Sequence, residues 1–251
     1  MRIIGDGLIA RSLQPFAGAH DRVLAFATGV SDSACTSDTE FARECALLYE
    51  VLEDARSAHA KIVYFSGGGA LYGRWDRPAI ESGPLEPRSQ YGRHQLFCEG
   101  VVAAAGVSYL VVRLPNVVSG GANPHQLIPN IVAQVLEGQV HVQSRAQRDL
   151  IDAADLGPVV VELLGSAADR DVVNVATGIS VDAPTIVSEI CAILGASPSI
   201  IAEDRGESQH FDTAHLRQIL GRDPFANGST YRELLRRYVP QLAEGLTKSR
   251  V

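Results

Sequence analysis

Residues 2–10 read Arg2-Ile3-Ile4-Gly5-Asp6-Gly7-Leu8-Ile9-Ala10, and this stretch decides the fold of the chain. A short apolar strand runs directly into a G-x-G-x-x-A turn, after which residues 8–16 can form a helix. The first glycine of such a turn permits a tight bend, the second lets a pyrophosphate approach the backbone, and the small third residue allows close helix–strand packing. Free N–H groups at a helix start favour an anion. The stretch therefore predicts a dinucleotide-binding unit, with an ordinary strand–helix turn as the alternative.

Strand and helix patterns alternate after this turn. Buried strands are predicted at residues 23–27, 61–65 and 109–114, and helices at 39–58 and 91–105. Such alternation is typical of a parallel sheet covered by helices. We therefore predict an α/β fold, a Rossmann-like doubly wound and mostly parallel sheet.

The C-terminal half has a more mixed pattern. Helices are predicted at 126–136, from Asp182 to a closing Gly195, and from Thr230 to Pro240, where the proline should end the helix. Residues 172–176 read as a further parallel strand. We expect residues 1–122 to form the dinucleotide-binding core and residues 123–251 mainly a small substrate-binding lobe, with 158–178 returning to the core.

Composition limits the classes of function. The chain has 251 residues, of which 46% are hydrophobic, and a net charge of −7. These values fit a packed core and argue against a general binder of nucleic acids or anionic membranes. No segment reaches the roughly 18 apolar residues of a membrane span, so a cytoplasmic location is expected. The four cysteines form no C-x-x-C pair, which favours reduced thiols over a disulfide frame or a metal site.

Further segments follow the glycine turn in a fixed order. They are Val63-Tyr64-Phe65-Ser66, Leu71-Tyr72-Gly73, Tyr91-Gly92-Arg93, Arg113-Leu114-Pro115-Asn116, Arg148-Asp149 and Asn174-Val175-Ala176-Thr177-Gly178. In order and spacing the chain resembles the extended short-chain dehydrogenase/reductase family, the NAD-dependent epimerases and dehydratases that mostly act on nucleotide sugars. The resemblance implies NAD or NADP as cofactor and a nucleotide-linked sugar or related small metabolite as substrate. It also implies a homodimer formed through helices 39–58 and 91–105.

Three departures from the family pattern set this chain apart. First, the glycine turn is followed at once by the strand at 23–27, so the usual second and third strands, which build the adenosine pocket, are expected to be missing. An acidic residue that closes the second strand normally holds the adenosine ribose. Asp21 precedes the next strand and Asp32 follows its end by several residues, so neither is well placed for that role.

The second and third departures concern the catalytic residues. The family motif Tyr-x-x-x-Lys has Tyr91 here, but Gln95 replaces the lysine whose charge lowers the tyrosine pKa in the family. A free phenol has a pKa of about 10, so about one in a thousand is ionised at pH 7. The family Ser or Thr falls at Gly68, which leaves Ser66 as the nearby hydroxyl, either as a catalytic group or as a strand-end contact to cofactor. The acidic pair of the family's sugar dehydratases would fall at Gly69 and Ala70, which disfavours 4,6-dehydration.

The resemblance assigns the remaining site residues by position. Tyr91, Gln95 and Ser66 are the candidate catalytic residues. The implied cofactor contacts are Gly5, Asp6, Gly7, Leu8, Ile9, Ala10, Ala27, Thr28 and Pro115. The implied substrate contacts are Gly68, Tyr72, Asn116, His125 and Arg148, of which the planar Arg148 guanidinium suits a diphosphate.

Three functions remain open from the sequence. In the first, hydride passes between nicotinamide and a carbonyl carbon while Tyr91 handles the proton. In the second, the cofactor groove holds another ligand and Tyr91 catalyses a non-redox isomerisation or cyclisation. In the third, the chain is a catalytically inactive binding or partner subunit.

Overall fold

A five-stranded parallel sheet forms the centre of the molecule. The computed structural model describes residues 1–73, 77–121, 123, 125–206 and 208–248. The strand order is β1-β2-β3-β4-β8, and each neighbouring pair is parallel. The strands are β1 (Arg2–Ile4), β2 (Val23–Phe26), β3 (Lys61–Gly67), β4 (Tyr109–Leu114) and β8 (Asp171–Asn174). The α/β, Rossmann-like prediction is thus confirmed, and in the described part of the chain β1 is an edge strand with β2 as its single neighbour.

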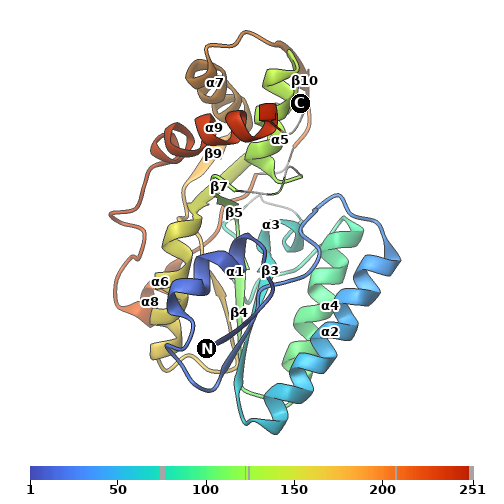
Figure 1. Ribbon diagram of the computed structural model, residues 1–251, viewed down its shortest axis with the longest axis vertical. Helices are drawn as coiled ribbons and strands as arrows, with labels where there is room; N and C mark the ends of the chain where they lie inside the picture. The colour runs from blue at the N-terminus through green and yellow to red at the C-terminus, as the bar shows by residue number, and fades with distance from the viewer. Residues whose placement is uncertain (74–76, 122, 124, 207, 249–251) are drawn as a thin grey trace.

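Helices cover both faces of this sheet (Figure 1). On one face lie α2 (Asp38–Ser57) and α4 (Gln90–Ala104), whose apolar sides pack on β2, β3 and β4. On the other lie α1 (Leu8–Leu13), the 3₁₀ turn η1 (Gln14–Phe16), α6 (Ala153–Gly165) and α8 (Ala214–Leu220). The Ser37 side chain accepts the Glu40 N–H at 3.3 Å, which caps the start of α2 as the Ser-x-x-Glu pattern predicts.

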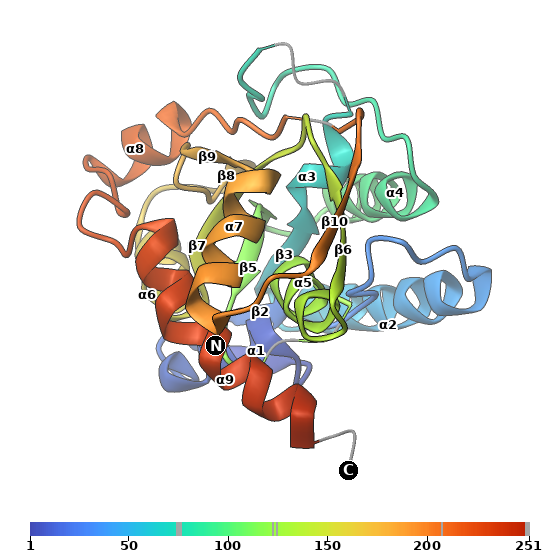
Figure 2. The same ribbon diagram turned by 90° about the horizontal axis from the view of Figure 1, so that it is seen from above.

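A second lobe is built from the C-terminal half (Figure 2). Its core is formed by α5 (Leu127–Leu136), α7 (Ala183–Leu194), α9 (Tyr231–Lys248) and the parallel pair β6 (Gln139–Gln143) and β10 (Ser199–Glu203). A three-stranded sheet of β5 (Asn116–Val118), β7 (Gln147–Asp152) and β9 (Ser180–Asp182) leads from the first lobe into it. The one-turn helix α3 (Gly68–Leu71) follows β3.

Helix α9 corrects the predicted role of Pro240. The helix continues through this proline to Lys248 instead of ending there. A proline inside a helix loses one backbone hydrogen bond, which costs about 3 kcal/mol. Val239 and Leu242 on either side of Pro240 are buried against α5 and α7, and this packing outweighs the loss.

The longest helices, α2 and α9, each have one apolar side and one charged side. Across the described ranges, no helix has the length and apolar character needed to cross a membrane.

Candidate active site

The carboxyl ends of the first four strands open into a cavity of about 840 Å³. Both lobes contribute to its wall, because loops after β1, β2, β3 and β4 meet residues of the second lobe there. Most of the residues assigned from the sequence lie on this wall. They are Asp6, Gly7, Leu8, Ile9, Ala27, Thr28, Ser66, Tyr91, Gln95, Pro115, Asn116, His125 and Arg148.

The glycine turn has the geometry that its sequence predicts. Gly5 has φ +121°, and a Cβ at this position would collide with the Ala27 carbonyl, so a glycine is required. Gly7 precedes α1 without a side-chain cap, and no heavy atom lies within 4 Å of where its Cβ would be. Uncapped N–H groups and open space therefore face the cavity at Gly7, as a phosphate group needs.

The Tyr91 side chain lies beside the last residue of β3, Gly67. Tyr91 is in the first turn of α4, and Ser89 caps this helix by accepting the Gly92 N–H at 3.0 Å. The Tyr91 hydroxyl would lie 2.7 Å from a Cβ built on Gly67. The glycine at position 67 thus leaves room for the phenol, and this position, not Gly68, faces Tyr91.

Gln95 follows Tyr91 by one helical turn and is buried. Its Oε1 accepts the Gly67 N–H at 3.2 Å and lies 3.4 Å from the Tyr64 hydroxyl. Gln95 therefore holds the end of β3 through a neutral amide and brings no positive charge to Tyr91.

Unlike Gln95, Ser66 is buried without a hydrogen-bond partner among the described residues. It is 2% exposed, and its Oγ makes no hydrogen bond to any described residue. The second-lobe residue Gln126 has a buried Oε1 in the same condition, and both residues belong to the cavity wall. Because buried polar atoms are normally paired, these two oxygens are the best candidates for ligand contacts.

Carboxylates, not cations, dominate the field at Tyr91. Burial is the main cause that raises the pKa of the Tyr91 phenol above its ordinary value, and the Glu44 and Asp32 carboxylates raise it further. Glu44 is buried beneath the loop after β2, where its Oε2 accepts the Val30 N–H at 2.8 Å. The phenol therefore stays protonated: it is a weaker acid than a free tyrosine, but it can give its proton to a more basic alkoxide, and it is not available as a phenolate base.

The substrate side of the cavity is polar. Asn116 donates to the Asp149 carbonyl and to Gln209 Oε1, both at 3.2 Å. Arg148 is half-buried on the wall, where its Nη1 donates to the Gln147 carbonyl at 2.8 Å, and His125 is exposed at the rim. An arginine and two amide side chains can together bind an anionic, hydroxyl-rich ligand.

Four of the assigned residues do not reach the cavity wall. Gly5 shapes the turn, Ala10 is buried in the core, and a Cβ on Gly68 would meet the Phe211 ring instead of the cavity. Tyr72 is 3% exposed, and its hydroxyl donates to Asn174 at 2.7 Å.

The Tyr72 hydroxyl also accepts a hydrogen bond from Arg113 Nη1 at 3.0 Å. Arg113 is itself paired with Glu99 at 2.7 Å in the interior. Tyr72 therefore belongs to a buried network that braces the sheet, and we do not include it among the ligand contacts.

Sequence reasoning missed several wall residues. Asp32 is poorly placed by its sequence position to hold an adenosine ribose, yet it lies on the wall with the rest of the 29–34 loop. In the sequence Glu44 looks like an ordinary carboxylate on a helix. The residue that could have pointed to it is Gly29, because a Cβ at position 29 would lie 2.6 Å from the Glu44 carboxyl carbon. Gln126 and Gln209 belong to no sequence motif, because their position on the cavity wall depends on how the second lobe folds over the first.

A family model and several solved structures match this chain. Residues 10–176 match the model of the NAD dependent epimerase/dehydratase family. No curated protein matches the sequence. Among solved structures, RMD from Pseudomonas aeruginosa complexed with NADPH aligns with a TM-score of 0.80 at 18% identity, over 96% of this chain and 98% of that one.

Two further similar structures are enzymes of nucleotide sugars. A UDP-glucose 4-epimerase with UDP-glucose from Thermotoga maritima aligns with a TM-score of 0.76 at 20% identity, over 96% of this chain and 84% of that chain. A dTDP-glucose 4,6-dehydratase in complex with NAD from Bacillus anthracis aligns with a TM-score of 0.76 at 17% identity, over 96% and 79%. At these identities the alignments show that the fold is shared.

Proposed function

This chain belongs to the NAD-dependent epimerase/dehydratase family, and from that premise we propose that it is an NAD(P)-associated enzyme acting on a nucleotide-linked sugar or a related small metabolite. In this proposal Tyr91 donates a proton to a carbonyl oxygen of the substrate. One observation carries the proposal: the Tyr91 phenol, the open turn at Gly7 and the Arg148 guanidinium belong to the wall of one cavity. The similar structures hold NADPH, NAD or UDP-glucose, which supports this choice of ligands.

The residues on the wall fit one half of a dinucleotide better than the other. Gly7 and the first N–H groups of α1 would hold the pyrophosphate, Thr28 and Ser66 would contact the nicotinamide half, and Gln95 would bind its ribose. Bound nicotinamide would supply or accept the hydride. The sheet ends at β1, so the strands that hold the adenosine half in the family are absent from the described chain.

Tyr91 has a separate task from the turn. Its raised pKa keeps the phenol protonated at neutral pH, so it stabilises negative charge that develops on a carbonyl oxygen as hydride arrives. Arg148 would bind the diphosphate of the substrate, while Asn116 and Gln126 would bind its hydroxyl groups. The proposed direction is therefore reduction of a carbonyl, for which a proton donor is required.

Isothermal titration with NAD, NADH, NADP and NADPH tests the cofactor. We expect affinity in the micromolar range for at least one of them. Gly7→Ala should weaken it at least about ten-fold without loss of stability, because the added methyl fills only the open space that a phosphate needs. Gly165→Ala is the matched control, since it adds the same methyl in open space far from the cavity. Absence of binding for all four nucleotides would refute an NAD(P)-associated function.

Turnover tests the role of Tyr91. The purified protein is incubated with a reduced cofactor and a panel of 4-keto nucleotide sugars, and consumption of the cofactor is followed. Tyr91→Phe should lower kcat by about 10²-fold or more with little change in affinity. An unchanged rate in Tyr91→Phe would remove Tyr91 from the mechanism.

One observation favours a second candidate, a binding subunit without catalysis. Gln95 leaves Tyr91 without a cationic partner at the family lysine position, and the Glu44 and Asp32 carboxylates raise the pKa of the phenol. In that case nucleotide sugars would bind and Gly7→Ala would weaken any dinucleotide binding, yet no substrate of the panel would be consumed. The non-redox alternative would instead convert a sugar with no change in the cofactor.

A further inference from the structure

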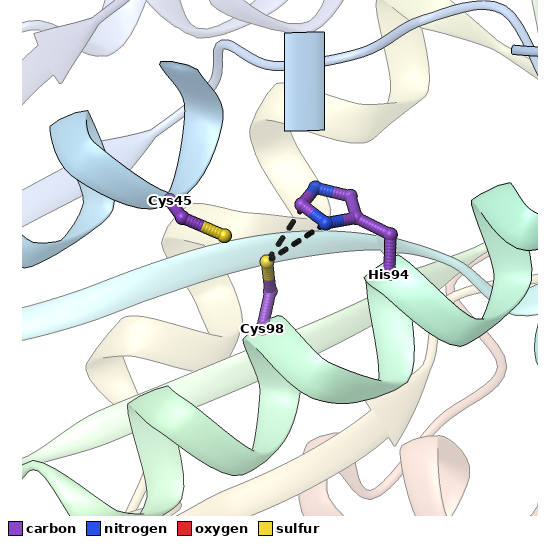
Figure 3. A group of neighbouring side chains, drawn as sticks. All are labelled: Cys45, His94 and Cys98. Atoms are coloured by element: carbon purple, nitrogen blue, oxygen red, sulfur yellow. Dashed lines mark hydrogen bonds between the residues drawn. The ribbon is translucent and has the colours of Figure 1, made fainter. Parts of the chain in front are cut away.

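Two cysteines and a histidine meet between α2 and α4 (Figure 3). Cys45 comes from α2, while His94 and Cys98 lie one turn apart on α4. The candidate ligand atoms of the three residues all lie within 4.8 Å of one another. None of these residues belongs to the cavity wall that carries Tyr91 and Arg148.

From this cluster we propose a second site, outside the nucleotide cavity, which binds one thiophilic divalent metal ion, Zn²⁺ by preference, through Cys45, His94 and Cys98. Thiolate and imidazole are the donors that zinc selects, and a histidine and a cysteine four positions apart on a helix face the same side. The ion would join α2 to α4.

The distances suit such an ion. Cys98 Sγ lies 3.6 Å from His94 Nε2 and 4.0 Å from His94 Nδ1. In a tetrahedral zinc site with bonds of about 2.3 Å to sulfur and about 2.0 Å to nitrogen, neighbouring sulfur and nitrogen ligands are roughly 3.5 Å apart. The Nδ1 distance exceeds this spacing by about 0.5 Å, which a small movement of the side chains closes.

The surroundings hold the imidazole in place. Glu44 Oε2 lies 3.0 Å from His94 Nε2, and the Phe41 ring stacks on the imidazole with centroids 4.5 Å apart. Metal-binding histidines commonly give their second nitrogen to a carboxylate, which fixes the ring and raises its basicity. With Nε2 donating to Glu44, Nδ1 is the nitrogen left to bind the ion, and it lies 4.0 Å from Cys98 Sγ. Glu44 is thus assigned as a positioning residue.

The burial of the cluster also agrees with a metal site. His94 and Cys98 are buried, so two of the three donors are shielded from water. Cys45 is half-buried, which leaves a route for the ion and a fourth coordination position for water. No zinc pattern is visible along the sequence, because Cys45 and His94 lie 49 positions apart on two different helices and the cysteines form no C-x-x-C pair.

The ion would also affect the cavity through the residues that it holds. Glu44 contacts both His94 and the Val30 N–H, and Gln95 follows His94 on α4. Clamping α2 to α4 would therefore fix the wall that presents Tyr91. The site is structural in this proposal, and no substrate contacts it.

The test uses the full chain, reduced and freed of metal. Zn²⁺ is titrated in competition with a chromophoric chelator, and Co²⁺ is titrated with detection of the charge-transfer and ligand-field bands of a tetrahedral thiolate complex. We expect one equivalent of either ion and a higher Tm with Zn²⁺. Cys45→Ser and Cys98→Ser should each weaken binding more than about ten-fold, and Glu44→Gln should weaken it about ten-fold.

Matched controls come from the other two cysteines. Cys35→Ser and Cys191→Ser make the same change outside the cluster and should leave the affinity unchanged. Cys45 is half-buried, so its serine variant is expected to fold even if the buried Cys98→Ser does not, and circular dichroism checks both. Binding by Cys45→Ser equal to that of the unmodified chain overturns the proposal. A reduced chain that binds neither ion also overturns it, whether or not Cys45 and Cys98 form a disulfide on oxidation.

Discussion

Gln95 is the residue whose chemistry most changes this site relative to its family. Its amide oxygen accepts the Gly67 N–H, and it supplies the Tyr91 phenol with no charge. Glu44 and Asp32 then determine the sign of the local field, and they raise the pKa of Tyr91 beyond what burial alone does. A single neutral substitution on α4 thus changes which form of the phenol is available.

Restoring a cation at position 95 should reverse the shift. In Gln95→Lys the ammonium favours the phenolate, so the pKa of Tyr91 should fall by about one unit or more. Stability should fall by about 1–3 kcal/mol, because the Gly67 N–H loses its acceptor. The titration is followed by the ¹³C shift of labelled tyrosine, and Gln95→Met, a variant of similar length without charge, is the control. A pKa that does not fall in the lysine variant would contradict this account of the electrostatics.

Asp149 provides a second test at the residue scale. This buried carboxylate accepts from Thr177 Oγ1 at 2.8 Å and from the Gly178 N–H at 2.7 Å, which ties β7 to the turn after β8. Burial raises its pKa to about 6 even though these hydrogen bonds lower it. The folded chain therefore binds a proton here more tightly than the unfolded chain does.

The sign of the pH effect follows from that difference. Stabilisation by protonated Asp149 is complete below the unfolded pKa near 3.8 and is lost as the pH rises to about 6, by up to about 3 kcal/mol. The stability advantage of the unmodified chain over Asp149→Asn should thus shrink between pH 4 and pH 7. Urea denaturation of both proteins at several pH values measures it, and an advantage that grows with pH would contradict the assignment.

Sequence motifs alone place some residues correctly on the cavity wall, but not Tyr72. Tyr91, Ser66 and Arg148 could be assigned because each has a fixed place in an ordered set of motifs, and all three lie on the cavity wall. Tyr72 has an equally fixed place, but its hydroxyl is occupied by Asn174 and Arg113. No spacing rule reveals that, because both partners come from distant strands.

Among the elements, α3 and the glycines before it show how the second lobe controls the first. A Cβ on Gly68 would lie 2.7 Å from the Phe211 ring and 3.2 Å from the Leu114 carbonyl. Phe211 is buried, and its ring is fixed edge-on against Tyr72 with centroids 6.0 Å apart. The space that a serine would use is therefore filled from the C-terminal half of the chain.

Gly68→Ser should consequently destabilise the fold and restore no activity. We expect a loss of about 1–3 kcal/mol from overpacking, measured by urea denaturation. Adding Phe211→Leu should make the loss in the double variant smaller than the sum of the two single losses, because the two sites share one space. Gly100→Ala, which meets no atom within 4 Å, is the control for adding a methyl group. Strict additivity would show that the ring is not the obstacle.

Element prediction succeeded where a pattern is long or capped. The strands of the main sheet, α2 and α4 were predicted within a few residues, because buried β-branched runs and the Ser37 cap are local signals. Strands β5, β6, β7, β9 and β10 were not predicted, because polar residues flank or interrupt their few apolar residues. The end of α9 was misplaced because tertiary packing, not the local proline, decides it.

At the scale of the whole molecule, α2 and α4 present an outer face with two exposed aromatic rings. Tyr49 on α2 is 52% exposed and Phe97 on α4 is 53% exposed. Figure 1 shows the two helices side by side at the periphery of the sheet. Together with the resemblance to the family, this supports the proposal of a homodimer that joins two copies of this pair of helices.

Light scattering after size exclusion tests the proposal. The unmodified chain should have twice the 26.8 kDa mass of one chain, and the double variant Tyr49→Asp/Phe97→Asp should have the mass of one chain. Ile179→Asp, at a position 68% exposed in the second lobe, should leave the mass unchanged. A monomeric unmodified chain at micromolar concentration would exclude the dimer.

Because β1 is an edge strand, the chain can lack the strands beyond it and still form a continuous sheet. Strands removed from the margin leave the ladder from β2 to β8 uninterrupted, whereas excision of a middle strand would part the sheet in two. The same margin accounts for the half-exposed Ile3 and Ile4, which a neighbouring strand would otherwise cover. Loss or addition of strands beside β1 therefore disrupts the fold least. A pair of strands grafted there would pair with β1 without disturbing Tyr91.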